Sequence, residues 1–241
     1  MIIKRAFSYT YTIGTEDKVS VTSPVSGSTS TITHYLRQAE GFWAGLKGVL
    51  DEFGVSGSYD INTGEAIIDG AKIYLFCCGN ALRICDNDNS YSMSWTYTGY
   101  SSYCGQNIGI TIKGTKNSWA IYLGSGSSVG SENFMFAVLG FKRFSDNKIV
   151  KGVMFGNYDL FSPTEDGNWL ERQSILTNSK SSSSASPTYE GFALVPAVVT
   201  GMGGIIVDAY LLCAGFLEKN SYYTLGSIPV VNVLDKLLIA I

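Results

Sequence analysis

The stretch from Ser90 to Thr98 alternates strictly between two kinds of side chain. The even positions hold only serine and threonine, and the odd positions hold Tyr91, Met93, Trp95 and Tyr97. Because successive side chains of a β-strand point to opposite faces, this pattern predicts a strand with one packed face and one uncharged, hydrated face. Similar stretches recur along the chain, which indicates a protein built mainly from β-strands.

One segment has the period of a helix. Its apolar residues fall on one stripe at spacings of three and four: Leu36, Ala39, Trp43, Leu46, Leu50 and Phe53. This spacing predicts an amphipathic helix at about 31–53, after a loop at about 14–30, with Gly54 as its C-cap. Since only one side of the helix is apolar, we expect it to lie across a sheet.

Short apolar runs between turn residues predict most of the other elements. We expect strands at 3–13, 72–78, 81–85, 107–113, 117–123, 133–142 and 148–154, and a loop at 160–168. Gly79-Asn80 predicts a two-residue hairpin that pairs Cys77 with Leu82, Leu75 with Ile84, Phe76 with Arg83 and Tyr74 with Cys85. The whole pattern predicts a mainly β fold of antiparallel sandwich or barrel-like sheets with one amphipathic helix packed on a sheet.

The chain has 241 residues, which is enough for one large core or two modest ones. We expect a β-rich domain over 1–160 and an apolar C-terminal β region over 161–241, either separate or part of the same domain. The serine-rich tract at 179–186 is expected to be exposed and mobile. The last segment, 228–241, is so apolar that it must be buried in its own sheet or against a neighbour.

Charge is scarce in this sequence. Charged residues make up 15% of it, against about 25% in an average soluble domain, and the net charge is −3. This composition argues against a nucleic-acid partner, which needs a positive surface. The N-terminus has no apolar secretory segment, and Asp208 interrupts the most apolar C-terminal stretch, so we expect no membrane insertion and folding in a cytoplasm.

The cysteines give no sign of a metal or disulfide framework. There are five, and none has the C-x-x-C spacing: Cys77, Cys78, Cys85, Cys104 and Cys213. We expect all five to be thiols, as is usual in a reducing compartment. His34 is the only histidine, so a zinc site is not expected, and neither is any other cofactor.

Candidate catalytic patterns have simpler interpretations. Asp86–Ser90 resembles the start of a calcium loop, but Tyr91 and Tyr97 occupy the positions that need Gly and Glu. The glycine-rich stretch 124–131 lacks the Lys that follows a phosphate-binding loop. His34, at the start of the expected helix, is expected to be a surface or capping residue. The carboxylates have no spacing that singles out a catalytic pair: Glu65, Asp69, Glu165, Asp166 and Glu171.

Two aromatic residues are the best candidates for a surface contact. Tyr100 and Tyr103 fall in the predicted loop 98–105, where they are available to another protein or to a glycan. No catalytic, metal-binding or cofactor-binding residue is predicted.

These features together resemble bacteriophage virion structural proteins, especially tail and baseplate components and other particle accessory proteins. The similarity extends over the whole chain: a leaderless start, strands rich in Ser, Thr and Tyr, few charges, Gly-Ser loops and an apolar terminal segment. It implies a non-enzymatic protein, made in a bacterial host, that assembles in symmetric copies with other virion proteins. We expect part of the C-terminal third to lie in a subunit interface. The alternatives are a carbohydrate-binding or receptor-binding adhesin module on a host surface glycan, and a glycan-active enzyme.

Overall fold

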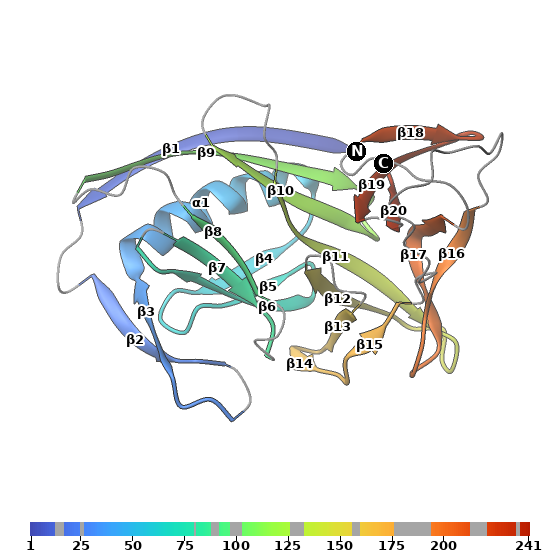
Figure 1. Ribbon diagram of the computed structural model, residues 1–241, viewed down its shortest axis with the longest axis horizontal. Helices are drawn as coiled ribbons and strands as arrows, with labels where there is room; N and C mark the ends of the chain where they lie inside the picture. The colour runs from blue at the N-terminus through green and yellow to red at the C-terminus, as the bar shows by residue number, and fades with distance from the viewer. Residues whose placement is uncertain are drawn as a thin grey trace, which may run out of the picture.

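Strands dominate the computed structural model (Figure 1). It describes residues 1–12, 17–24, 27–79, 81–87, 92–96, 103–125, 133–155, 160–175, 194–212, 221–234 and 237–241. Within these ranges there are twenty strands and one helix. The strand pairs are antiparallel, so the predicted fold class, mainly β with antiparallel sheets and a single helix, is confirmed.

The largest sheet crosses the whole molecule and is curled. Its main path has eight strands in the order β1 (Ile2–Thr12), β9 (Tyr103–Gly114), β10 (Trp119–Ser125), β11 (Asn133–Arg143), β17 (Gly204–Leu212), β20 (Leu237–Ala240), β19 (Ile228–Leu234) and β18 (Tyr222–Leu225). Five more strands branch from it: β12 (Ile149–Phe155), β13 (Leu160–Glu165), β14 (Asn168–Trp169), β15 (Gln173–Ser174) and β16 (Leu194–Val199). The path ends at β1 on one side and at β18 on the other.

A second sheet has the order β4 (Gly57–Asp60), β5 (Glu65–Ile68), β6 (Ala71–Cys77), β7 (Ala81–Cys85) and β8 (Ser92–Thr96). The predicted β6–β7 register is confirmed at all four pairs, including Cys77 with Leu82 and Phe76 with Arg83. In β8, Trp95 is the register partner of Leu82 and Met93 that of Ile84.

The helix α1 (Leu36–Phe53) starts five residues later than predicted. Residues 31–35 instead form β3 (Thr31–Tyr35), which pairs with β2 (Lys18–Thr22) inside the expected loop. The expected loop at 160–168 is also wrong, because it contains β13 and β14. In both places the chain is extended because a neighbouring strand supplies backbone hydrogen bonds: β2 pairs with β3, and β12 pairs with β13.

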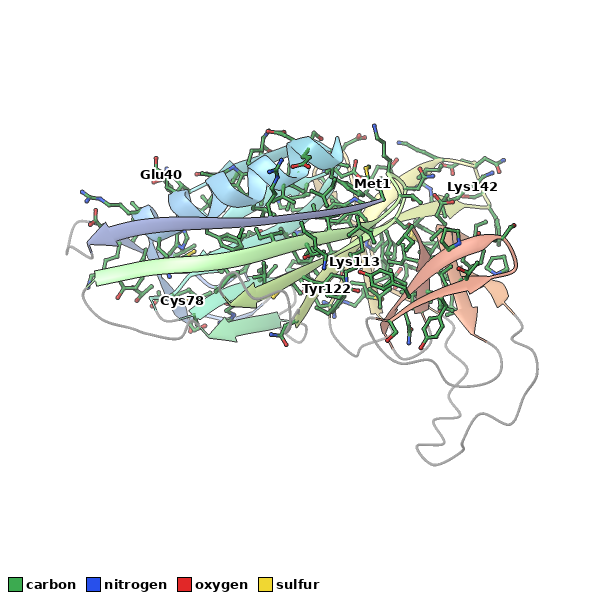
Figure 2. The ribbon with its side chains drawn as sticks, turned by 90° about the horizontal axis from the view of Figure 1, so that it is seen from above. Met1, Glu40, Cys78, Lys113, Tyr122 and Lys142 are labelled. Atoms are coloured by element: carbon green, nitrogen blue, oxygen red, sulfur yellow. The ribbon has the colours of Figure 1, made fainter. Side chains whose placement is uncertain are left out.

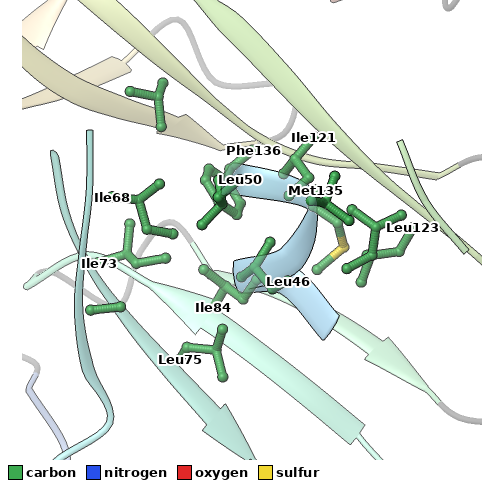
Figure 3. Packing of buried hydrophobic residues seen from close by; sticks show 14 of the residues in the cluster. Leu46, Leu50, Ile68, Ile73, Leu75, Ile84, Ile121, Leu123, Met135 and Phe136 are labelled. Atoms are coloured by element: carbon green, nitrogen blue, oxygen red, sulfur yellow. The ribbon is translucent and has the colours of Figure 1, made fainter. Parts of the chain in front are cut away.

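The main core lies between the two sheets, and α1 contributes one face to it. Leu46 and Leu50 of α1 meet Leu75 and Ile84 from the second sheet, and Ile121, Met135 and Phe136 come from the large sheet (Figure 3). Gly54 ends the helix in a left-handed conformation, with φ at 82°, so the predicted C-cap is confirmed. Trp43, expected on the core stripe, is only half-buried and stacks on Tyr59 at one flank, with ring centroids 5.1 Å apart.

The C-terminal strands bury their own apolar residues. Val230, Val231 and Val233 of β19 and Leu237–Ile239 of β20 are all buried within this chain, most of them in a second core with β10, β11 and β17. The apolar composition of 228–241 therefore has an explanation inside the molecule. A subunit interface in the C-terminal third stays a prediction.

Candidate functional site

His34 lies in the interior of the molecule, so its assignment to a helix surface or cap is wrong. It belongs to β3 and is completely buried. The backbone N–H of Cys77 donates to its Nδ1 across 3.1 Å. Nδ1 therefore carries no hydrogen, and Nε2–H is the donor that lies 2.9 Å from the Ile61 carbonyl and 3.2 Å from the Tyr59 hydroxyl.

This arrangement makes His34 a joint between three elements. It links β3 to β6 through Cys77, to the β4–β5 turn through Ile61, and to β4 through Tyr59, whose hydroxyl donates to the Leu75 carbonyl across 3.0 Å. Burial lowers the pKa of His34 and raises the pKa of Tyr59, because both charged forms lose hydration. The ring is thus held neutral, with its nitrogens engaged by structural partners.

Asp86 belongs to a buried ion pair. Its carboxylate is fully buried, accepts from Arg172 Nη2 across 2.8 Å, and accepts from the Ser162 hydroxyl across 2.6 Å. Arg172 keeps 20% of its side chain exposed. The pair joins the end of β7 to β13 and the segment before β15. In the sequence, Asp86 stands out only as the start of a calcium-loop-like stretch, of which residues 88–91 lie outside the described ranges.

The other candidate carboxylates are mostly engaged in ion pairs between strands. Glu65 pairs with Lys72 and Asp69 with Lys151, each across 2.6 Å. Lys151 Nζ also donates to the Lys116 and Asn117 carbonyls, so all three of its hydrogens have acceptors. Lys148 and Arg143 donate hydrogen bonds to Glu165, and these bonds hold the pKa of this carboxyl below its usual range. These carboxylates thus tie strand ends together.

Three of the cysteines can be placed. Cys77, Cys78 and Cys85 are thiols, and burial raises the pKa of Cys78 and raises that of Cys85 to about 12. A high pKa keeps a thiol protonated and unreactive. The side chains of Cys104 and Cys213 lie outside the description. Among the described residues, no cluster of three or more His, Cys, Asp or Glu side chains could hold a metal ion.

The structure separates the two tyrosines proposed for surface contacts. Tyr100 lies outside the described residues, as does most of the glycine-rich stretch 124–131. Tyr103 is the first residue of β9 and pairs in register with Thr12, so the predicted loop ends earlier than residue 105. The side chain of Tyr103 is not among those described.

Among the described strands, β1 forms the longest edge of the large sheet that has no strand paired to its outer side. β1 pairs along its eleven residues with β9, and the sheet path ends there. From Ala6 to Thr12 the strand contains neither charge nor proline. Edge strands of monomeric proteins usually carry such residues, because exposed N–H and C=O groups otherwise pair with another chain. We call the outward backbone of 6–12 the β1 edge.

The helix α1 runs beside this edge. In Figure 1, α1 lies beneath β1. In Figure 2, which is the view from above, α1 lies on the side of β1 away from β9. Arg5 Nε binds Glu52 Oε2 across 2.5 Å, which fixes the end of α1 against the start of β1. Glu52 shares a helix stripe, at spacings of four and three, with Gly48, Gly45 and Gly41. We call these three glycines the glycine shelf.

The opposite edge of the sheet, β18, is also uncharged. No charged residue occurs from Ser221 to Leu234, and Tyr222 is 46% exposed. The ammonium of Lys113 lies 4.2 Å from the ring centroid of Tyr122 and 5.0 Å from that of Tyr222. Figure 2 shows Lys113 and Tyr122 on this side of the molecule. This contact holds β18 against the β9–β10 layer, so the second edge has a defined position.

Comparisons with known proteins found no match: no family model, no curated protein and no solved structure is detectably similar to this chain. Among the described residues, no helix has both the length and the apolarity needed to cross a membrane. The candidate functional surface rests on the geometry alone, and it consists of the two uncharged sheet edges.

Proposed function

We propose that this protein is a non-enzymatic structural component of a bacteriophage or phage-tail-like particle, where it assembles in multiple copies. The observation that carries the proposal is the pair of uncharged edges, β1 and β18, at the two ends of one large sheet. Open edges of this kind are an aggregation hazard for a protein that works alone. In a particle, they become surfaces on which copies dock.

The polar interior supports the same proposal. His34, Asp86 and Asp69 each bridge separate strands, and each is engaged with partners inside the chain. Such cross-links stiffen a β framework. A low content of charge also suits large permanent interfaces, whose centres are poor in charged residues.

The proposal is tested on purified particles. Particles from a bacterial culture that produces this chain are separated from soluble protein on a density gradient, and their subunits are quantified by mass spectrometry. We expect the chain in the particle fraction, in a fixed ratio to the other particle proteins. Recovery of the chain only from particle-free fractions, with complete particles from a deletion strain, would contradict the proposal. A host-derived soluble protein followed through the same gradient is the control.

A further inference from the structure

We propose that copies of this chain join head to tail, with the β1 edge of one copy pairing with strand β18 of the next, so that the large sheets become continuous between molecules. The inference rests on the proposed function and names the interface that it requires. Within the described ranges both strands are end strands of the same sheet, and neither contains a charged residue in the paired stretch, 6–12 and 222–225.

The position of α1 excludes the simpler alternative of two β1 edges pairing about a two-fold axis. A strand of a second copy that pairs with β1 would lie over α1, because α1 lies beneath β1 and on its side away from β9 (Figures 1 and 2). A two-fold copy would bring its own α1 to the same face of the joined sheet. The two helices would then compete for one space. The arriving strand must therefore come without a helix beneath it.

Strand β18 meets this requirement. Within the described part of the chain, α1 is the only helix, and it lies at the β1 end of the sheet. Tyr222 and Thr224 lie on one face of β18 and are exposed, and β18 is the last strand of the sheet path. Pairing of unlike edges is a heterologous contact, and it gives a ring when the rotation closes and a filament when it does not.

The glycine shelf leaves room for the incoming strand. A β-carbon added to Gly48 would meet no atom within 4 Å, so open space exists at this point of the helix. α1 and β1 run in opposite directions, and the Arg5–Glu52 pair sets their alignment. Residues 6–12 span about 20 Å at the rise of a strand, and the shelf from Gly41 to Gly48 spans about 10 Å at the rise of a helix. The shelf therefore lies alongside about half of the β1 edge.

The test uses one charge on each edge. Thr10→Lys adds a positive charge to the β1 edge, and Thr224→Lys adds one to β18; an edge lysine blocks strand pairing. Sedimentation velocity should show assemblies for the unchanged chain and 26.1 kDa monomers for each variant alone. A mixture of the two variants has one intact β1 edge and one intact β18 edge, so it should form dimers and nothing larger.

The outcomes separate this inference from the proposed function. If the unchanged chain assembles and Thr224→Lys assembles equally well, the head-to-tail interface is wrong and the multi-copy proposal stands. If the mixture stays monomeric while circular dichroism shows both variants folded, the interface is also wrong. If the unchanged chain is itself monomeric, the head-to-tail interface is wrong. The multi-copy proposal is then wrong as well if the chain is missing from purified particles, and it stands if the chain is found in them.

Substitutions on α1 test separately whether the glycine shelf makes room for the incoming strand. Gly48→Leu should weaken association at least about tenfold, because the new side chain occupies the space above α1 (about 1.4 kcal/mol). The matched control is Glu40→Leu, which adds the same side chain to an exposed position about 100° around the helix from Gly41. Equal effects of the two substitutions would contradict the role of the shelf.

Discussion

At the scale of single residues, the polar groups of this protein are used to join strands. His34 receives a hydrogen bond from Cys77 and lies within hydrogen-bond distance of Ile61 and Tyr59. Its position was mispredicted because Thr31–Tyr35 was assigned to the helix. The alternation of 31–35, matched by a second alternation at 18–22, is the signal in the sequence that indicates a hairpin instead.

His34 should make stability depend on pH. Burial lowers its pKa in the folded protein below the value of 6.5, so the folded state keeps the ring neutral while the unfolded chain takes up a proton below that pH. The unfolded state is therefore favoured as the pH falls from about 6.5 toward the folded pKa, and the stability is fully present only above this range. Urea midpoints measured from neutral to mildly acidic pH should decrease over it.

Two variants control this measurement. His34→Leu leaves the Cys77 N–H and the Ile61 carbonyl without their partner, so we expect a loss of about 1–3 kcal/mol at neutral pH for each group. This variant should also lose most of the decrease between neutral and acidic pH. Tyr59→Phe keeps the imidazole and should keep the decrease. An equally steep decrease in His34→Leu would show that other groups cause it.

Asp86 should be important for stability because its charge is fully buried. Asp86→Ala leaves the Arg172 guanidinium with one acceptor fewer, and we expect a loss near 3 kcal/mol, the lower end for broken buried pairs, since Arg172 is partly exposed. Chemical denaturation measures the loss. The matched control, Lys47→Ala, breaks the exposed pair with Asp51 and should cost less than about 1 kcal/mol. Similar losses for the two variants would contradict this account of Asp86.

At the scale of elements, local signals were sufficient where neighbouring segments pair. The β6–β7 register follows from Gly79-Asn80 and the alternation on either side, and the structure confirms this register. The start of α1 did not follow, because the short alternation of 31–35 adjoins the helical pattern, and β13 did not follow, because its strand is stabilised by pairing with β12. Asp86 and Arg172 are separated by 86 positions in the sequence, so no local spacing of residues predicts this ion pair.

Two glycines of α1 should respond in opposite directions to the same substitution. Gly48 is exposed within the helix and has open space around it, so Gly48→Ala should stabilise the monomer by about 0.5–1 kcal/mol. Gly54 has φ at 82°, a conformation that costs other residues about 1–2 kcal/mol, so Gly54→Ala should destabilise it. Thermal unfolding of both variants measures these two changes in stability. A change of the same sign in both would contradict the assignment of Gly54 as the C-cap.

At the scale of the whole molecule, the alternation and turn spacing predict the class of fold, and the strand order locates the candidate surface. The apolar C-terminal segment directed attention to residues 191–241, yet β19 and β20 are packed in their own chain. The open edges depend on strand order, which places β1 and β18 at the ends of one sheet although they are far apart in sequence. Strand order is a long-range property, so the edges could not be recognised from local patterns.

The mass of the unchanged chain in solution shows whether copies of this protein associate with one another. Light scattering coupled to size-exclusion chromatography, over a series of micromolar concentrations, reports that mass without any variant or label. The account predicts assemblies of at least two copies, with a mass that rises in multiples of 26.1 kDa as concentration increases. A single species of 26.1 kDa at every concentration, from protein shown to be folded, would contradict the head-to-tail interface, and it would contradict assembly in multiple copies if the chain is also missing from purified particles.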